Sequence, residues 1–262
     1  MKAYIEHIGL QAPGLEGWDD SQTVLTGDTP YQSEPLSKYS PQFLPANERR
    51  RTTPTIKLAL RTAEETVSGY APEAIAAMPT LFACVDGDTE ISAKMTSAIL
   101  QDEPMISPIH FHNSVHNAPA GYWMIGQHNQ QAASAISAGE YQIANSFIEA
   151  LSQLSDTHPK VLLVVYDLPI DPIIESYQPA MQPFAFGLVL SHQPNDRTLA
   201  ELSLSLAPGQ VQAVKHDWFG DNVAAEALPL LQRLAQKQAG QFAFPVSSQL
   251  TANLTLTPVQ RD

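Results

Sequence analysis

The sequence is poor in cysteine and in basic residues, and both shortages exclude classes of function. A single cysteine, Cys84, rules out an intramolecular disulfide framework and suits a reducing compartment. The 14 lysines and arginines face 27 aspartates and glutamates, which gives a formal net charge of −13. A chain so acidic cannot neutralise a run of phosphates, so nucleic acid is excluded as a partner.

Long apolar runs are also missing. No window approaches 18 consecutive apolar residues, so we expect no transmembrane helix and no membrane insertion. The first ten residues, MKAYIEHIGL, lack the apolar stretch of a secretory signal. We therefore expect a cytoplasmic protein.

Short catalytic signatures are absent as well. The chain has no G-x-S-x-G elbow and neither of the glycine-rich phosphate-binding patterns, and we expect no cofactor. Cys84 lies in the apolar segment 81–85 (LFACV), where a lone cysteine is more often a small core residue than a nucleophile. Asp88, in the acidic turn that follows, is expected to cap a helix.

Strand-like and helix-like segments alternate along the chain. Period-two or fully apolar patterns predict strands at 3–10, 80–85, 161–166, 184–190, 198–206 and 251–257. Apolar stripes at helical spacing predict helices at 53–69, 89–100, 117–130, 138–154 and 222–239. Only residues 11–52 look irregular. This order predicts an α/β protein with one domain over residues 1–262.

Three histidines stand close together in HFHNSVHNAPAGYW (110–123). On a strand, His110 and His112 would share one side, and His116 could return to them from the next turn, which is a spacing that zinc can use. Acidic residues are sparse nearby and Cys84 belongs to another segment, so we expect no metal site. Interface or loop histidines are the other interpretation, and both stay open on the residues alone.

Several segments resemble the N-terminal half of a β-ketoacyl synthase, an enzyme of the thiolase-like fold. The first is Ser107-Pro108 followed by Asn117-x-x-Ala120-Gly121, which is similar to the synthase segment that leads toward the nucleophile. The second, SAISAGEYQIANSFIEAL (134–151), is similar to the family's nucleophile helix, and the strand VLLVVY follows it. The resemblance implies a thiolase-like fold truncated to the N-terminal half of a ketosynthase.

The departures from this family concern its catalytic groups. The family's cysteine falls at Ser137 or Ala138, and a serine without a base beside it is a poor nucleophile. The family's two catalytic histidines belong to a C-terminal half, and only about 70 residues follow the strand FAFGLVL here. The resemblance therefore implies a protein that is not an enzyme by itself.

What remains resembles the stand-alone chain length factors of the ketosynthase family, as found in aryl-polyene-type biosynthesis. The segments HNSVHNAPAGYW and LPANERRRTTPT (44–55) are especially close to that group. The resemblance implies a non-catalytic subunit that forms a heterodimer with an active β-ketoacyl synthase and meets the acyl carrier protein only indirectly. The residues expected at the interface and acyl pocket are His110, His112, Ser114, His116, Asn117, Tyr122 and Trp123.

Three other functions stay open at this point. The first is a thiolase-fold acyltransferase that acts alone through Ser137 or Cys84. The second is a zinc protein built on the histidine cluster, and the third is a structural homodimer. The net charge favours the subunit interpretation, because an acidic chain repels an acidic carrier protein and leaves its docking to the partner.

Overall fold

A mixed β-sheet runs through the computed structural model, which describes residues 1–174, 181–212 and 215–259. Its strands are β1 (Lys2–Ala12), β2 (Leu15–Glu16), β3 (Thr80–Ala83), β4 (Ala133–Ile136), β5 (Lys160–Asp167), β6 (Phe184–Ser191), β7 (Ala200–Pro208), β8 (Gly240–Ser247) and β9 (Leu250–Pro258). The strand order is β4-β3-β5-β6-β1-β7-β9-β8, and β2 pairs with β1. β3 is parallel to both β4 and β5, while the remaining pairs are antiparallel.

Helices occupy most of the connections. They are α1 (Gln22–Thr26), α2 (Ala46–Arg49), α3 (Pro54–Thr66), α4 (Pro72–Ala76), α5 (Thr89–Ile99), α6 (Pro108–Asn113), α7 (Ala118–Gln127), α8 (Gln142–Ser152) and α9 (Leu228–Ala235), with the 3₁₀ turns η1 (Gly139–Tyr141) and η2 (Ala224–Ala227). In the described ranges, no helix has both the length and the apolar content needed to cross a bilayer.

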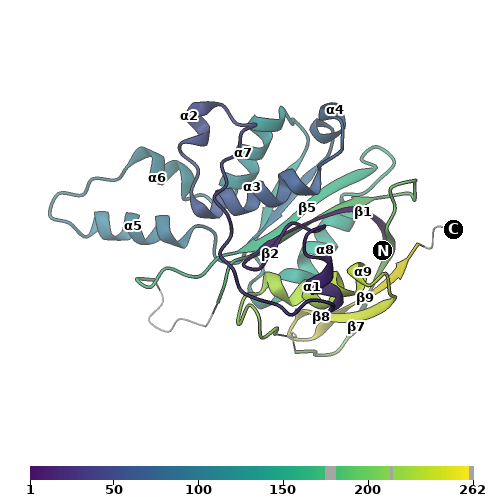
Figure 1. The fold of residues 1–262 in the computed structure, drawn as a ribbon. Coiled ribbons are helices and arrows are strands. Elements are labelled where there is room, and N and C mark those ends of the chain that lie inside the picture. Colours follow the sequence, from purple (N-terminus) through teal and green to yellow (C-terminus); the bar gives the residue numbers. More distant parts are fainter. Residues whose placement is uncertain (175–180, 213–214, 260–262) are drawn as a thin grey trace.

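The central strands are buried on both faces, because helices cover the sheet from two sides. Side chains alternate along a strand, so Leu81 and Leu163 join one core cluster while Phe82 and Val164 join the other. The first cluster packs under α8, α9 and η2, and the second packs under α3 and α7. Figure 1 shows α3 and α7 on one side of the sheet and α8 and α9 on the other.

The predicted helix starts at 53 and 89 are confirmed. Thr53 Oγ1 accepts a hydrogen bond from the Ile56 amide at 3.2 Å, and Pro54 occupies the first turn of α3. Asp88 Oδ1 accepts one from the Ile91 amide at 3.0 Å and caps α5 in the same way.

α3 lies unusually close to the sheet because two glycines face it. Gly9 of β1 and Gly187 of β6 are paired across the strands, and both meet Thr66 of α3. A Cβ atom at Gly187 would stand only 2.1 Å from Thr66 Oγ1, and one at Gly9 would stand 2.4 Å away. This contact fixes the depth at which α3 sits on the strands.

The structure departs from the predicted elements in several places, and one of them is the short helix α4, which was not predicted. Residues 110–112 form part of helix α6, not a strand, because Pro108 starts a helical turn there. The edge strands β4 and β8 were not predicted. The irregular segment 11–52 contains β2, α1 and α2, and Tyr31 stacks on Trp218 at a ring distance of 4.3 Å, so it packs against the body.

Candidate functional site

Three strand ends meet at one edge of the sheet. Because β3, β4 and β5 run parallel, the residues that follow them lie side by side: Cys84 and Val85 after β3, Ser137 after β4, and Asp167 at the end of β5. The carboxyl ends of parallel strands are where α/β folds place their functional groups. We therefore take this edge as the candidate functional site.

Asp167, at the end of β5, connects two of these strand ends through hydrogen bonds. Its Oδ1 atom accepts hydrogen bonds from the Val85 amide at 2.7 Å and from Cys84 Sγ at 3.2 Å. Its Oδ2 atom has no hydrogen-bond partner among the described residues. The side chain is almost fully buried, and this burial raises the pKa of Asp167 to about 7. No sequence pattern singled out this residue, although a carboxylate that ends an apolar strand (VLLVVYD) is a usable signal.

Cys84 belongs to the core and not to the reactive surface. It is buried, its thiol donates to Asp167, and the Gly87 amide donates to Sγ at 3.3 Å. Burial, reinforced by the Asp167 carboxylate, raises the pKa of this thiol well above its usual value. A thiol held in its protonated form is a poor nucleophile, so this geometry counts against acyl transfer through Cys84.

Ser137 and Ala138 stand at the junction between β4 and the η1–α8 helix, where the family resemblance puts the nucleophile. The Ser137 hydroxyl donates a 2.6 Å hydrogen bond to the Val85 carbonyl. The Ala138 amide donates to Gln142 Oε1 at 2.7 Å. Both donors at this junction therefore already have partners inside the chain.

The three histidines do not converge. His116 Nε2 hydrogen-bonds the Cys84 carbonyl at 2.8 Å, and the His112 ring stands edge-on to Tyr122 at 6.0 Å. His110 lines a separate hollow beside Arg50. Residues two apart on a helix point in nearly opposite directions, which explains why α6 separates His110 from His112. Within the ranges that the structure describes, no group of three or more His, Cys, Asp or Glu side chains is placed to hold a metal ion.

Tyr122 and Trp123, both expected at the interface and acyl pocket, face different surroundings. Trp123 is fully buried and packs edge-on against Phe43 at 5.5 Å, so its side chain lies in the core of this chain. The reason is that α7 turns this side chain toward α3 and the sheet. Tyr122 is also mostly enclosed, and its hydroxyl donates to Asn113 Oδ1 at 2.9 Å. Tyr122 nevertheless lines a surface groove.

That groove, of about 520 Å³, brings several predicted interface residues together. It lies along α6 and α7, and its lining includes Phe111, His112, Val115, Asn117, Gly121 and Tyr122. Ser114 lies between two of these residues, and its hydroxyl donates to the Phe111 carbonyl at 2.9 Å. A Cβ atom added at Gly121 would meet nothing within 4 Å, so the groove is open there.

Exposed apolar side chains continue from the groove along α5, α6 and their connection, which project from the body in Figure 1. We call this the arm surface, made up of Ile99, Leu100, Met105, Ile106, Ile109, Phe111, Val115 and Ile125. Met105 is 83% exposed, Leu100 78% and Phe111 65%. Apolar clusters of this kind on a folded chain mark sites of interaction with another molecule. The part of this surface at residues 99–106 was not predicted from the sequence.

Comparisons with known proteins agree with this architecture. The family model described as "Beta-ketoacyl synthase, N-terminal domain" matches residues 18–251. A search of curated proteins found no match. A chain from the complex of a ketosynthase with its chain length factor from Xenorhabdus doucetiae is 22% identical, with a TM-score of 0.71 over 97% of this chain and 99% of that one.

Two further solved structures show the same fold at lower identity. A chain of the ishigamide ketosynthase/chain length factor is 10% identical, with a TM-score of 0.74 over 99% of this chain and 100% of that one. A ketosynthase from module 1 of the bacillaene synthase of Bacillus amyloliquefaciens FZB42 is 10% identical, with a TM-score of 0.59 over 82% of this chain and 47% of that one. The fold is therefore the thiolase-like fold of ketosynthases. This chain matches about half of the bacillaene ketosynthase and nearly all of the other two chains.

Proposed function

The chain belongs to the family of β-ketoacyl synthase N-terminal domains, and from that premise we propose that it is a non-catalytic subunit that pairs with an active β-ketoacyl synthase. The partner's cysteine takes the acyl chain from an acyl carrier protein and condenses it with a malonyl unit, with loss of carbon dioxide. This chain closes part of the acyl pocket and limits product length, in polyene- or fatty-acid-type biosynthesis such as that of aryl polyenes.

The junction between β4 and α8 supports the non-catalytic role. Acyl transfer needs a nucleophile with a base, and backbone amides that are free to stabilise an oxyanion. Ser137 instead donates its hydroxyl proton to the Val85 carbonyl, and the Ala138 amide is bonded to Gln142. The Ser137 hydroxyl and the Ala138 amide are therefore both engaged inside the chain, which does not favour acyl transfer at this position.

The arm surface is the observation that carries the proposal of a protein partner. It continues into the groove, whose small lining residue Gly121 lets another backbone or side chain approach closely. The groove also lies near the junction between β4 and α8. His116, in the turn between α6 and α7, bonds the Cys84 carbonyl, and Ser137 bonds the adjacent Val85 carbonyl. A partner that covers the groove therefore comes close to Ser137 and Ala138 of this chain, where β-ketoacyl synthases have their nucleophile.

The similar structures support the choice of partner. Two of them come from proteins described as a ketosynthase with its chain length factor. A rigid wall limits product length because extra methylenes forced against fixed side chains cost about 1–3 kcal/mol. His112 and Tyr122, which line the groove, are the side chains we propose for that wall, with Ser114 beside it, while His110 faces a separate hollow.

Co-expression of the tagged chain with a ketosynthase from the same organism tests the proposal. We expect an equimolar complex on gel filtration with light scattering, which Gly121→Phe abolishes by filling the groove. Gly121→Ala is the matched control, since a methyl group meets nothing within 4 Å, and it should leave the complex intact.

Condensation by the purified pair gives the second readout. It should require the cysteine of the ketosynthase and should persist in the pair that carries Ser137→Ala. A stable homodimer that ignores the ketosynthase, or acylation of Ser137 by an acyl thioester, would contradict the proposal.

A further inference from the structure

A second cavity lies on the side of the chain that carries η1 and η2, away from the groove. It has a volume of about 950 Å³, which is the size of a small-molecule site. Glu140 and Tyr141 of η1, Lys215, Asp221, Glu226 of η2 and Ser247 of β8 are among its lining residues. We call it the acidic cavity, and the proposed pairing with a ketosynthase makes no use of it.

Glu226 is the unusual residue of this cavity. Only 6% of it is exposed, yet none of the described residues donates a hydrogen bond to its carboxyl group. A carboxyl group so enclosed is costly to ionise, and a bound cation can recover part of that cost. Burial raises the pKa of Glu226 to about 8, against the opposing charge of Lys215 and with additional repulsion from Glu140 and Asp167.

The charges around Glu226 favour a cation. Lys215 is the cationic side chain among the described lining residues, and it already forms an ion pair with Asp221. Glu140 accepts a hydrogen bond from the Tyr141 hydroxyl. Once Lys215 is paired with Asp221, the negative charges of Glu140 and Glu226 are not balanced by another cation among the described lining residues. Val211, Val223 and Pro245 supply apolar walls to the same cavity.

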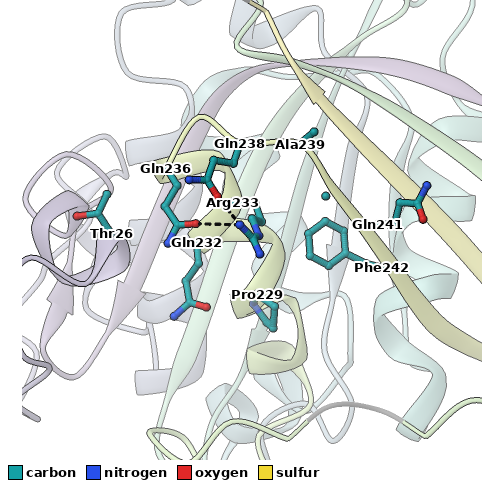
Figure 2. A pocket seen from close by; sticks show the side chains of 10 residues that line it. Thr26, Pro229, Gln232, Arg233, Gln236, Gln238, Ala239, Gln241 and Phe242 are labelled. Atoms are coloured by element: carbon teal, nitrogen blue, oxygen red, sulfur yellow. Dashed lines mark hydrogen bonds between the residues drawn. The ribbon is translucent and has the colours of Figure 1, made fainter.

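A cavity elsewhere in the fold contains a charged side chain whose hydrogen bonds are made within the chain, unlike those of Glu226. A polar hollow of about 910 Å³ between α1, α9 and β8 contains Arg233, whose guanidinium donates to the side chains of Gln236 and Gln238 (Figure 2). Its charged group is satisfied by neighbours that belong to the chain. By contrast, none of the described residues donates a hydrogen bond to the carboxyl group of Glu226.

We propose that the acidic cavity binds a small aliphatic amine, with its ammonium group on Glu226, Glu140 beside it and its alkyl chain against the apolar walls. The ammonium supplies the hydrogen-bond donors and the positive charge that the buried carboxylate lacks. A metal ion fits less well, because the described residues hold no cluster of three or more ligating side chains.

Calorimetric titration of the full chain with 1,4-diaminobutane tests this inference. Its amino groups stay protonated between pH 6 and 8, so only protein groups titrate in that range. The ammonium binds the ionised carboxylate, whose population grows as the pH rises. Below the pKa of Glu226, the affinity should therefore increase about tenfold for each unit by which the pH is raised. The neutral isostere 1,4-butanediol should not bind.

Substitutions of cavity residues test whether the amine binds in the acidic cavity. Glu226→Gln keeps the shape of the side chain and should weaken binding at least about tenfold and remove its pH dependence. Glu140→Gln should weaken binding but keep the pH dependence, and Glu73→Gln, on the distant helix α4, should change nothing. The fold of each variant is checked by its thermal midpoint.

Three results would overturn the inference. They are equal binding of the amine by wild type and Glu226→Gln, equal binding of the diol, or no heat of binding to wild type at millimolar amine. The wild-type pH series alone decides the matter if Glu226→Gln does not fold, since an affinity that is flat between pH 6 and 8 excludes a role for Glu226.

Discussion

Asp167 closes the end of β5 with a carboxyl group that water hardly reaches. Its Oδ1 atom orders the turn after β3 through the Val85 amide, while its Oδ2 atom is left without a partner among the described residues. A proton on the carboxyl group is therefore the less costly state in the folded chain. The group makes the folded chain sensitive to pH at the candidate site.

This pKa shift has a definite sign. The pKa of Asp167 is raised from 3.8 to about 7, so between these values the folded chain keeps a proton that the unfolded chain has lost. Stability should fall as pH rises through this window, by up to about 1.4 kcal/mol per pH unit. Asp167→Asn should remove this part of the slope, as measured by urea unfolding from pH 4 to 8. Parallel profiles for the two proteins would contradict the assignment, and Asp156→Asn, at an exposed position, is the control.

At the scale of elements, the sequence predicted the parts whose signals are local. The α3 start at Thr53-Pro54, the Asp88 cap of α5 and the buried strand β5 each depend on a few neighbouring residues. β4 and β8 were missed because edge strands are short of β-branched residues here and are defined by the strand they pair with. Likewise, helix α6 was not predicted, although Pro108 is a residue that favours the first turn of a helix.

The candidate site was predictable only in part. Residues near each other in the sequence, such as His112, Asn117 and Tyr122, do share one groove. Asp167 could not be assigned, because its burial depends on strands and turns from distant parts of the chain. The stretch from Ile99 to Ile106 carries no local pattern that predicts its exposure, which is seen only in the fold of the described residues.

The contact between α3 and the sheet gives a prediction at this scale. Gly187→Ala should lower the free energy of unfolding by about 1–3 kcal/mol, because the new methyl group would overlap Thr66 and force the helix outward. Urea denaturation with an unchanged m-value would measure it. Gly121→Ala is the control, since the helix has open space there. Equal stability of Gly187→Ala and wild type would show that α3 moves freely on the strands.

At the scale of the whole molecule, the charge of −13 determines which partners approach easily. Repulsion between two acidic proteins weakens as salt screens it, over a Debye length of about 10 Å at 0.1 M. We therefore expect no measurable binding of the isolated chain to an acidic acyl carrier protein at low salt. Surface plasmon resonance over a series of sodium chloride concentrations would test this. Binding that strengthens as the salt is lowered would contradict it.

The position of β1 in the sheet has a consequence for how the chain acquires its fold. β1 pairs Tyr4 with Ser191 and Lys2 with Ser203, so it depends on strands β6 and β7, which are synthesised much later than β1. At a synthesis rate of about 5–20 residues per second, β1 waits roughly ten seconds or more with its apolar side chains uncovered. Such distant pairings also slow folding after release. Nascent chains should thus depend on chaperones, and truncation before β6 should leave an aggregating fragment.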